Sequence, residues 1–287
     1  MSQRDGDGFD SLGGFYMSGF YVMEPRPYTV PKDLIKFVNT YAPSYFLGNP
    51  QIVPSARQSS PWAEEEIDKV LESKQGLRHR KDVIRVLAWK MGGLNHKSST
   101  EEYPFIFKTY RKNNLMWCDS YPERAVNNGN NVDNIHRLVS FIVDENNRYR
   151  WNSLEAGGCE KAKTILQDLS KCVEGDKDEE KVSQIGPVYL ITLLFFITSG
   201  EYPIYDIQAM KALKAIEMRK VPGEQIEIDG LPSDIKQQKF WDLYYREYIG
   251  LLKKYFHDEY KTNRNIDRAL WVYGHYFKAI SPRSGNK

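Results

Sequence analysis

The sequence has few cysteines and no long apolar run, and these two shortages exclude several classes of protein. Cysteine occurs only three times in 287 residues, at Cys118, Cys159 and Cys172. None of the three belongs to a C-x-x-C pair or lies near a pair of histidines, so neither a disulfide framework nor a zinc site has support. We therefore expect a reducing, cytoplasmic environment and no metal ion or other cofactor.

The longest apolar run is too short to cross a membrane. It extends from Val188 to Ile197, is interrupted by Thr192, and has about half the length of a bilayer-spanning helix. The chain begins Met-Ser-Gln-Arg-Asp-Gly-Asp-Gly, with acids and glycines where a secretory signal would have a cationic head and an apolar stretch. The sequence thus predicts an intracellular protein with no membrane partner.

The composition is that of a folded globular protein, with 41% hydrophobic, 27% charged and 13% aromatic residues. Forty basic residues against 38 acids leave a net charge of +2, which neither requires nor excludes binding to nucleic acid. Basic residues do gather between Arg78 and Lys112, with Tyr110 among them. Such a segment either follows a nucleic-acid backbone or forms a solvated helix face.

Helical periodicity dominates and predicts an all-α, mainly helical fold. Residues 1–30 are rich in glycine and aromatics without a period, and we interpret them as an N-terminal arm. Residues 31–287 are predicted to form one mainly helical domain with a core at about 156–280. Two predicted helices start at Pro31 and Pro61. Further helices are predicted over Arg80–Met91, Asp133–Val143, Ala162–Val173, Val188–Ile197, Ile207–Met218, Lys239–Tyr260 and Ile266–Phe277. One strand is predicted at Gln225–Ile228. The stripe expected on the first helix consists of Leu34, Ile35, Val38 and Tyr41.

Three segments around the longest apolar run bear on function: Gly158–Leu166, Val182–Tyr189 and Tyr202–Ala209. They predict a helix, a tight turn in which Gly186 allows unusual dihedral angles, an apolar helix started by Pro187, and a loop that delivers Asp206 to the next helix. As the N-cap of that helix, Asp206 would accept a hydrogen bond from a backbone N–H two or three residues later, worth about 1 kcal/mol. This structural role and a catalytic role are both open for Asp206.

The order of these elements resembles the helix-hairpin-helix, Gly/Pro-Asp superfamily of base-excision DNA glycosylases. Members of that family have a Lys-Ala-x-x-Ile helix, a Leu-Pro-Gly-Val-Gly hairpin, an apolar helix and a Val-Asp loop. Here Lys161–Ile165, Ile185–Gly186 and Ile204–Asp206 match the first, second and last of these, and 20 positions separate Gly186 from Asp206. The resemblance covers about Cys159 to Ile216 and is closest to bacterial proteins with an 8-oxoguanine-DNA-glycosylase-like fold.

The resemblance implies DNA as the partner and Asp206 as the catalytic carboxylate. In the family this aspartate stabilises positive charge on the sugar and positions the attacking nucleophile. The family's hairpin holds phosphates, which here implies DNA contacts by Gln184, Gly186, Val188, Tyr189 and Lys161. Val188 occupies the position of the lysine that forms a Schiff base in lyase-competent members, so the implied reaction is hydrolysis of an N-glycosidic bond by water.

Departures from the family pattern leave a second function open. Ser183 and Gln184 replace the usual hairpin proline and first glycine, and the acidic run Glu174–Glu180 precedes the hairpin. Negative charge repels a phosphate within about 8 to 10 Å at physiological salt. The alternative is a catalytically silent DNA- or nucleotide-binding module with the same helix-hairpin-helix fold.

Overall fold

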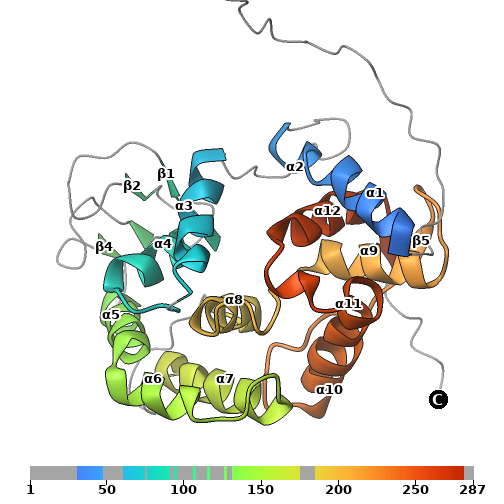
Figure 1. Cartoon of the computed structure of the whole chain (residues 1–287). Helices are drawn as coiled ribbons and strands as arrows, with labels where there is room; N and C mark the ends of the chain where they lie inside the picture. The colour runs from blue at the N-terminus through green and yellow to red at the C-terminus, as the bar shows by residue number, and fades with distance from the viewer. Residues whose placement is uncertain are drawn as a thin grey trace, which may run out of the picture.

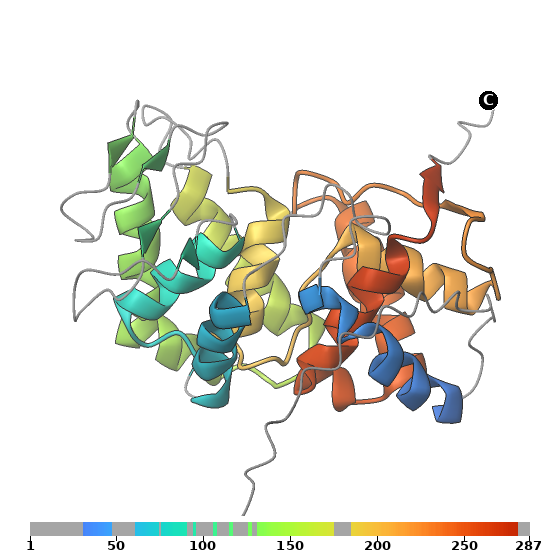
Figure 2. The same ribbon diagram turned by 90° about the horizontal axis from the view of Figure 1, so that it is seen from above.

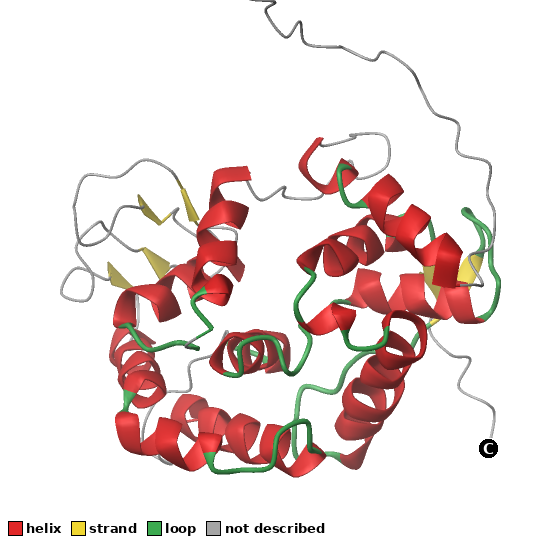
Figure 3. Ribbon diagram, viewed as in Figure 1, coloured by secondary structure: helices red, strands yellow, loops and turns green. Residues whose placement is uncertain are grey.

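A computed structural model describes residues 31–47, 61–74, 76–90, 94–95, 106–107, 115–116, 126–127, 131–174 and 185–280 of the chain. These residues are mainly helical, which confirms the predicted all-α class (Figure 3). The helices are α1 (Pro31–Tyr41), α2 (Ser44–Leu47), α3 (Pro61–Glu72), α4 (Arg80–Lys90), α5 (Asn131–Val143), α6 (Glu145–Asn152), α7 (Cys159–Glu174), α8 (Pro187–Ile197), α9 (Ile207–Glu217), α10 (Gln238–Trp241), the π-helix η1 (Asp242–Tyr248), α11 (Ile249–Phe256), the 3-10 helix η2 (Glu259–Lys261) and α12 (Arg264–Gly274). The arm expected at 1–30 lies outside the described residues.

The helices form two groups with α8 between them, as Figure 1 and the view from above in Figure 2 both show. One group contains α3 to α7, and the other contains α9 to α12 together with α1 and α2. The central helix is apolar on every side, and its residues Leu190–Phe196 are all buried. A helix without a polar face is stable in a water-soluble fold only when other elements enclose it. Helix α8 packs against α4 and α7.

The apolar residues of α7 are buried as its predicted helical span requires, whereas the stripe predicted on α1 differs from the observed burial. On α7, the residues Ala162, Ile165, Leu166, Leu169 and Val173 are buried. On α1, Phe37 is fully buried and Ile35 is 66% exposed, so the prediction for Ile35 was wrong. At 3.6 residues per turn, positions 34, 37, 38 and 41 share one face, and position 35 lies outside it.

The long helix predicted over Lys239–Tyr260 is not a single α-helix. Its middle section, η1, has the wider π-helical turn. The helix ends at Phe256, because His257 takes a φ of 50° in the left-handed region. A π-turn of this kind is recognised by its hydrogen bonding rather than by apolar spacing, so the sequence pattern did not indicate it.

The structure contains short strands, of which the sequence predicted only one. The predicted strand β5 (Gln225–Glu227) is present and pairs in parallel with β6 (Lys278–Ile280), which was not predicted. Two antiparallel pairs join β1 (Leu94–Asn95) to β2 (Ile106–Phe107) and β3 (Leu115–Met116) to β4 (Val126–Asn127). Strands of two or three residues have too little alternation to be found from periodicity.

A buried cluster of charges joins the two groups of helices. Glu64 of α3 is 1% exposed, and its Oε2 accepts hydrogen bonds from Arg264 (3.0 Å) and Arg268 (3.1 Å) of α12. Asp68, one turn later on α3, binds the same two guanidinium groups at 2.8 and 2.7 Å. The other oxygen of Glu64 accepts a hydrogen bond of 2.6 Å from the indole of Trp89 on α4. This Glu64 cluster therefore connects α3 and α4 to α12.

The charges in the Glu64 cluster compensate one another. Burial alone would raise the pKa of the Glu64 carboxyl, but Arg264, Trp89 and Arg268 outweigh it and hold that pKa below its ordinary value. The guanidinium of Arg264 also lies over the ring of Trp89, 4.9 Å from its centroid, in a cation–π contact. One carboxylate oxygen of Glu64 thus holds the start of α12, and the other binds Trp89 of α4.

Two glycines allow closer approaches than a residue with a Cβ would permit. Gly274 ends α12 so close to α9 that an added Cβ would lie 1.9 Å from the carbonyl oxygen of Gln208. Gly200, with a φ of +93°, would place a Cβ 2.1 Å from the carbonyl oxygen of Lys261. The start of α9 is therefore in direct contact with α12, and the turn after α8 is in direct contact with η2.

The expectations about disulfides and about membrane-spanning helices can be compared with the structure. In the part of the chain that the structure describes, Cys159 and Cys172 are free thiols, and Cys118 lies outside it. None of the described helices is long and apolar enough to cross a membrane.

Gly274→Ala is expected to lower the free energy of unfolding by about 3 kcal/mol, because the added methyl group forces the backbone of α9 away from α12. Gly250→Ala is the matched control: Gly250 is also helical, but the space around its Cβ position is open. There alanine should stabilise the helix by up to about 1 kcal/mol. Urea unfolding measures both, and equal stability of the two variants would contradict the close approach at Gly274.

Glu64→Gln is expected to cost about 3 kcal/mol, because it leaves two buried guanidinium groups with Asp68 as their remaining charged partner. Glu65→Gln, on the same helix but 65% exposed in its side chain, should change stability by less than about 0.5 kcal/mol. Since the pKa of Glu64 is lowered by folding, wild type should lose the contribution of this carboxylate as the pH falls below about 4.5. Denaturant unfolding at pH 7 and pH 4 tests this, and a difference between wild type and Glu64→Gln that does not shrink at low pH would contradict it.

Candidate active site

The loop that carries Asp206 is held in place by two buried tyrosines of η1. The hydroxyl of Tyr244 donates to the carbonyl oxygen of Pro203 at 2.9 Å, and the hydroxyl of Tyr248 donates to that of Ile204 at 2.8 Å. The two rings are stacked, with centroids 6.4 Å apart. Both tyrosines are buried, and they fix the backbone of the loop two residues before Asp206.

Asp206 is the N-cap of α9, as one of its two sequence interpretations predicted. Its backbone is extended, and Oδ1 accepts a hydrogen bond of 2.7 Å from the backbone N–H of Gln208. The second oxygen, Oδ2, has no hydrogen-bond partner within the described ranges of the chain. The side chain is only partly buried. The cap therefore uses one oxygen and orients the carboxylate, and the other oxygen is available for chemistry.

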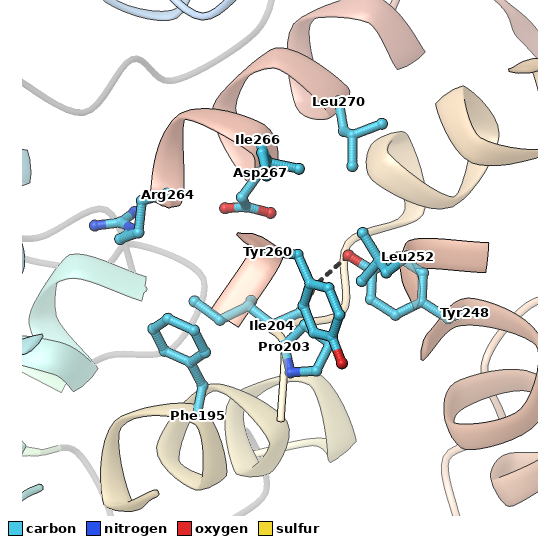
Figure 4. A pocket seen from close by; sticks show the side chains of 10 residues that line it. All are labelled: Phe195, Pro203, Ile204, Tyr248, Leu252, Tyr260, Arg264, Ile266, Asp267 and Leu270. Atoms are coloured by element: carbon cyan, nitrogen blue, oxygen red, sulfur yellow. Dashed lines mark hydrogen bonds between the residues drawn. The ribbon is translucent and has the colours of Figure 1, made fainter. Parts of the chain in front are cut away.

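The same loop forms one wall of a pocket, shown from close by in Figure 4. The walls are mostly apolar and aromatic, and the lining residues are Phe195, Pro203, Ile204, Tyr248, Leu252, Tyr260, Arg264, Ile266, Asp267 and Leu270. The space amounts to about 350 Å³, part of which is open solvent, and the gap between the walls is little wider than a water molecule. Asp206 lies two residues after Ile204 of this wall and does not itself line the pocket.

Asp267 brings a second carboxyl group to this region. It lies on α12, lines the pocket, and makes no hydrogen bond or ion pair with the residues described by the structure. Burial raises the pKa of the Asp267 carboxyl to about 6, with a further upward contribution from Asp206, although Arg264 and Lys90 oppose the shift. A carboxyl group of this kind exchanges its proton near neutral pH, which is what acid–base catalysis needs.

The charge of Asp206 also acts on the pKa values of Lys211 and His275. Lys211 is 7% exposed, and its ammonium donates to the carbonyl oxygen of Phe277 at 2.9 Å. Burial lowers the pKa of Lys211, and Asp206 works against this shift. Burial likewise lowers the pKa of His275, whose Nδ1 lies 2.7 Å from the carbonyl oxygen of Trp271. Both residues have backbone carbonyl partners, so their positions are accounted for structurally.

The residues expected to contact DNA are placed at the start of α8. Gly186 is the N-cap of this helix with φ of −81° and ψ of 177°, so it does not use the unusual dihedral angles that the sequence suggested. A Cβ on Gly186 would meet no atom within 4 Å, so the space beside this backbone is open. Val188 and Tyr189 follow in the first turn and are partly buried, and Gln184 lies outside the described residues. Contacts of these residues with DNA remain predictions.

Lys161 has a protein partner. It is 9% exposed, and its ammonium binds Glu201 at 2.8 Å. Glu201 also accepts a hydrogen bond from the backbone N–H of Gly157. Lys161 therefore ties α7 to the loop after α8, and a phosphate contact by its ammonium would compete with Glu201.

Metal binding has no support in this region. Of the histidine, cysteine and acidic side chains that the structure describes, no three or more are grouped so that they could hold a metal ion. Comparison of the chain with protein-family models, with curated proteins and with solved structures finds no match.

Asp267 is the main residue that the sequence analysis did not assign to the site. The available signal was an acid placed directly beside Ile266 in a strongly amphipathic helix. Periodicity shows that such an acid lies at the edge of the apolar face of its helix. It does not show which other segment of the chain packs against that edge. The contact with the Asp206 loop is formed by residues about 60 positions apart and required the tertiary structure.

Asp267→Asn is expected to stabilise the protein at pH 8 by up to about 3 kcal/mol. Folding raises the pKa of Asp267 from 3.8 to about 6, so the ionised form is less favourable in the folded state than in the unfolded one. The cost is absent below about pH 3.8, grows up to about pH 6, and is constant above. Urea unfolding of both proteins at pH 4 and pH 8 measures it. A variant that is less stable than wild type at pH 8 would show that Asp267 is not in such an environment.

Proposed function

We propose that this protein is a monofunctional DNA-glycosylase-like hydrolase that cleaves the N-glycosidic bond of a nucleotide extruded from the duplex, with Asp206 as the essential carboxylate. The observation that supports it most is the state of Asp206: one oxygen is fixed by the N-terminus of α9, and the other has no partner among the described residues. The adjoining pocket is apolar and aromatic, as a site that receives a flipped base must be.

The proposed role of Asp206 is electrostatic and positional. Cleavage of an N-glycosidic bond builds positive charge on the sugar, and a carboxylate held beside that charge lowers the barrier. The same carboxylate can accept a proton from the attacking water. Because Val188 stands at the start of α8, no amine at that position can attack the sugar, so the nucleophile is water.

The proposal requires the pocket to open when a base enters. The gap between its walls admits little more than a water molecule, and a nucleobase is much larger. The wall formed by Leu252 and Tyr260 belongs to α11 and to the three-residue η2, and η2 is the shorter of these two elements. Entry of a base by displacement of η2 is therefore part of the proposal.

A silent DNA-binding module is the second candidate, and one observation favours it. The cap of Asp206 is what a purely structural carboxylate would show. The pairing of Lys161 with Glu201 weighs equally on both candidates, because both need DNA contacts. Such a module would still bind DNA through the open backbone at Gly186, and it would release no base.

Asp206→Asn is expected to lower the single-turnover rate of base release by about 100-fold or more, because asparagine keeps the cap but removes the charge that stabilises the transition state. The substrates are duplex oligonucleotides that each carry one damaged base, including 8-oxoguanine, hypoxanthine, uracil and alkylated purines, and the readout is the free base by mass spectrometry. Asp144→Asn is the matched control, since Asp144 caps α6 in the same way at 3.1 Å and lies outside the site.

The two candidate functions give different results in this experiment. Base release by wild type that is unchanged in Asp206→Asn would contradict the role of Asp206. Duplex binding without release of any base from the panel would exclude the hydrolase and favour the silent module.

A further inference from the structure

We propose that Asp267 is a second catalytic carboxyl group, which donates a proton to the departing base while Asp206 acts on the sugar and the water. This inference rests on the proposed function and extends it from one carboxylate to two with different roles. It depends on where α12 places Asp267 and on what surrounds that side chain.

The pocket contains a carboxyl group without a hydrogen-bond or ion-pair partner in the described part of the chain. It belongs to Asp267, and it stands among apolar walls formed by residues such as Phe195, Leu252 and Leu270 (Figure 4). Polar groups that line an apolar pocket in folded proteins usually have partners, so this one marks a place where a ligand can supply one. A nucleobase has acceptor atoms on its edges that suit a protonated carboxyl.

The charges around Asp267 allow it to carry a proton near neutral pH. Those that face it are Arg264 on its own helix, Lys90 on α4, Asp206 before α9, Glu64 on α3, Tyr45 on α2 and Tyr248 on η1. Arg264 is already bound by Glu64 and Asp68, so it compensates Asp267 only in part. The carboxylate of Asp206 carries charge of the same sign and favours the protonated form of its neighbour.

Two carboxyl groups in different environments take different roles. Asp206 is partly exposed and accepts a backbone N–H bond at the start of α9, and Asp267 sits among apolar walls, which favour its neutral form. Environments that separate two carboxyl groups in this way define an acid and a base. The pair would supply both proton transfers of the hydrolysis.

The proposed step is balanced in atoms and electrons. The bond between C1′ and the base nitrogen breaks, and its electron pair goes to the base, which takes the proton of Asp267. The oxygen of water forms a bond to C1′, and its proton goes to Asp206. The products are the free base and an abasic sugar, and a proton then returns from Asp206 to Asp267 through solvent.

The test is the pH dependence of single-turnover base release, from pH 5 to 9, on a panel duplex from which wild type releases a base. The wild-type rate should fall as the pH rises above about 6, because the proton on Asp267 is lost. Asp267→Asn should be at least 50-fold slower at pH 6 and lack this fall, and Asp267→Glu should recover part of the rate with the fall restored. Asp242→Asn removes an exposed carboxylate that pairs with Arg246 and serves as the control with wild-type behaviour.

The outcomes separate the two proposals. Urea unfolding of Asp267→Asn at the assay pH shows that the variant is folded, so a slow rate is then a loss of chemistry. Wild-type rates and an unchanged pH profile in Asp267→Asn would overturn the role of Asp267 and leave that of Asp206 standing. Release of no base by wild type would overturn both.

Discussion

The buried cluster around Glu64 is the interaction on which the arrangement of the site depends. Glu64 and Asp68 hold Arg264 and Arg268, and these two arginines belong to the first turns of α12. Asp267 lies between them in the sequence, so the cluster determines where this carboxyl group lies. Glu64 is 1% exposed, and a charge at that depth is tolerated only because Arg264, Arg268, Trp89 and the hydroxyl of Tyr45 bind it. A contact made for structural compensation thus also positions a group that is a candidate for chemistry.

The Asp206 loop is positioned from a different direction. Tyr244 and Tyr248 bind its carbonyl groups, and Gly274 lets α12 come within backbone contact of α9. These contacts bring Asp206 and Asp267 close enough for the charge of one to raise the pKa of the other. Two nearby carboxyl groups with incomplete compensation reduce stability, and proteins keep such arrangements most often where activity needs them. The active site proposed above would account for such a pair.

Much of the helical fold was predictable, and the exceptions have identifiable causes. The stripe on α7 and the apolar helix α8 follow directly from residue spacing, and Asp206 is the cap that its position after Pro203 suggested. Ile35 was placed on the wrong side because its stripe was judged by adjacent apolar residues rather than by the 3.6-residue turn. The parallel pairing of β5 with β6 joins segments about 50 residues apart and leaves no trace in local pattern.

For the site, the sequence alone determined that an aspartate would stand at the start of a helix after a proline-rich loop, because capping and proline chemistry act within a few residues. It also determined that a lysine is missing at the start of α8. Only the tertiary structure decided that Asp267 faces the same region, that Lys161 is paired with Glu201, and that an apolar pocket lies between α8, α11 and α12. The physical reason is that burial, charge compensation and cavities arise from contacts between distant segments, and local spacing does not encode which faces meet.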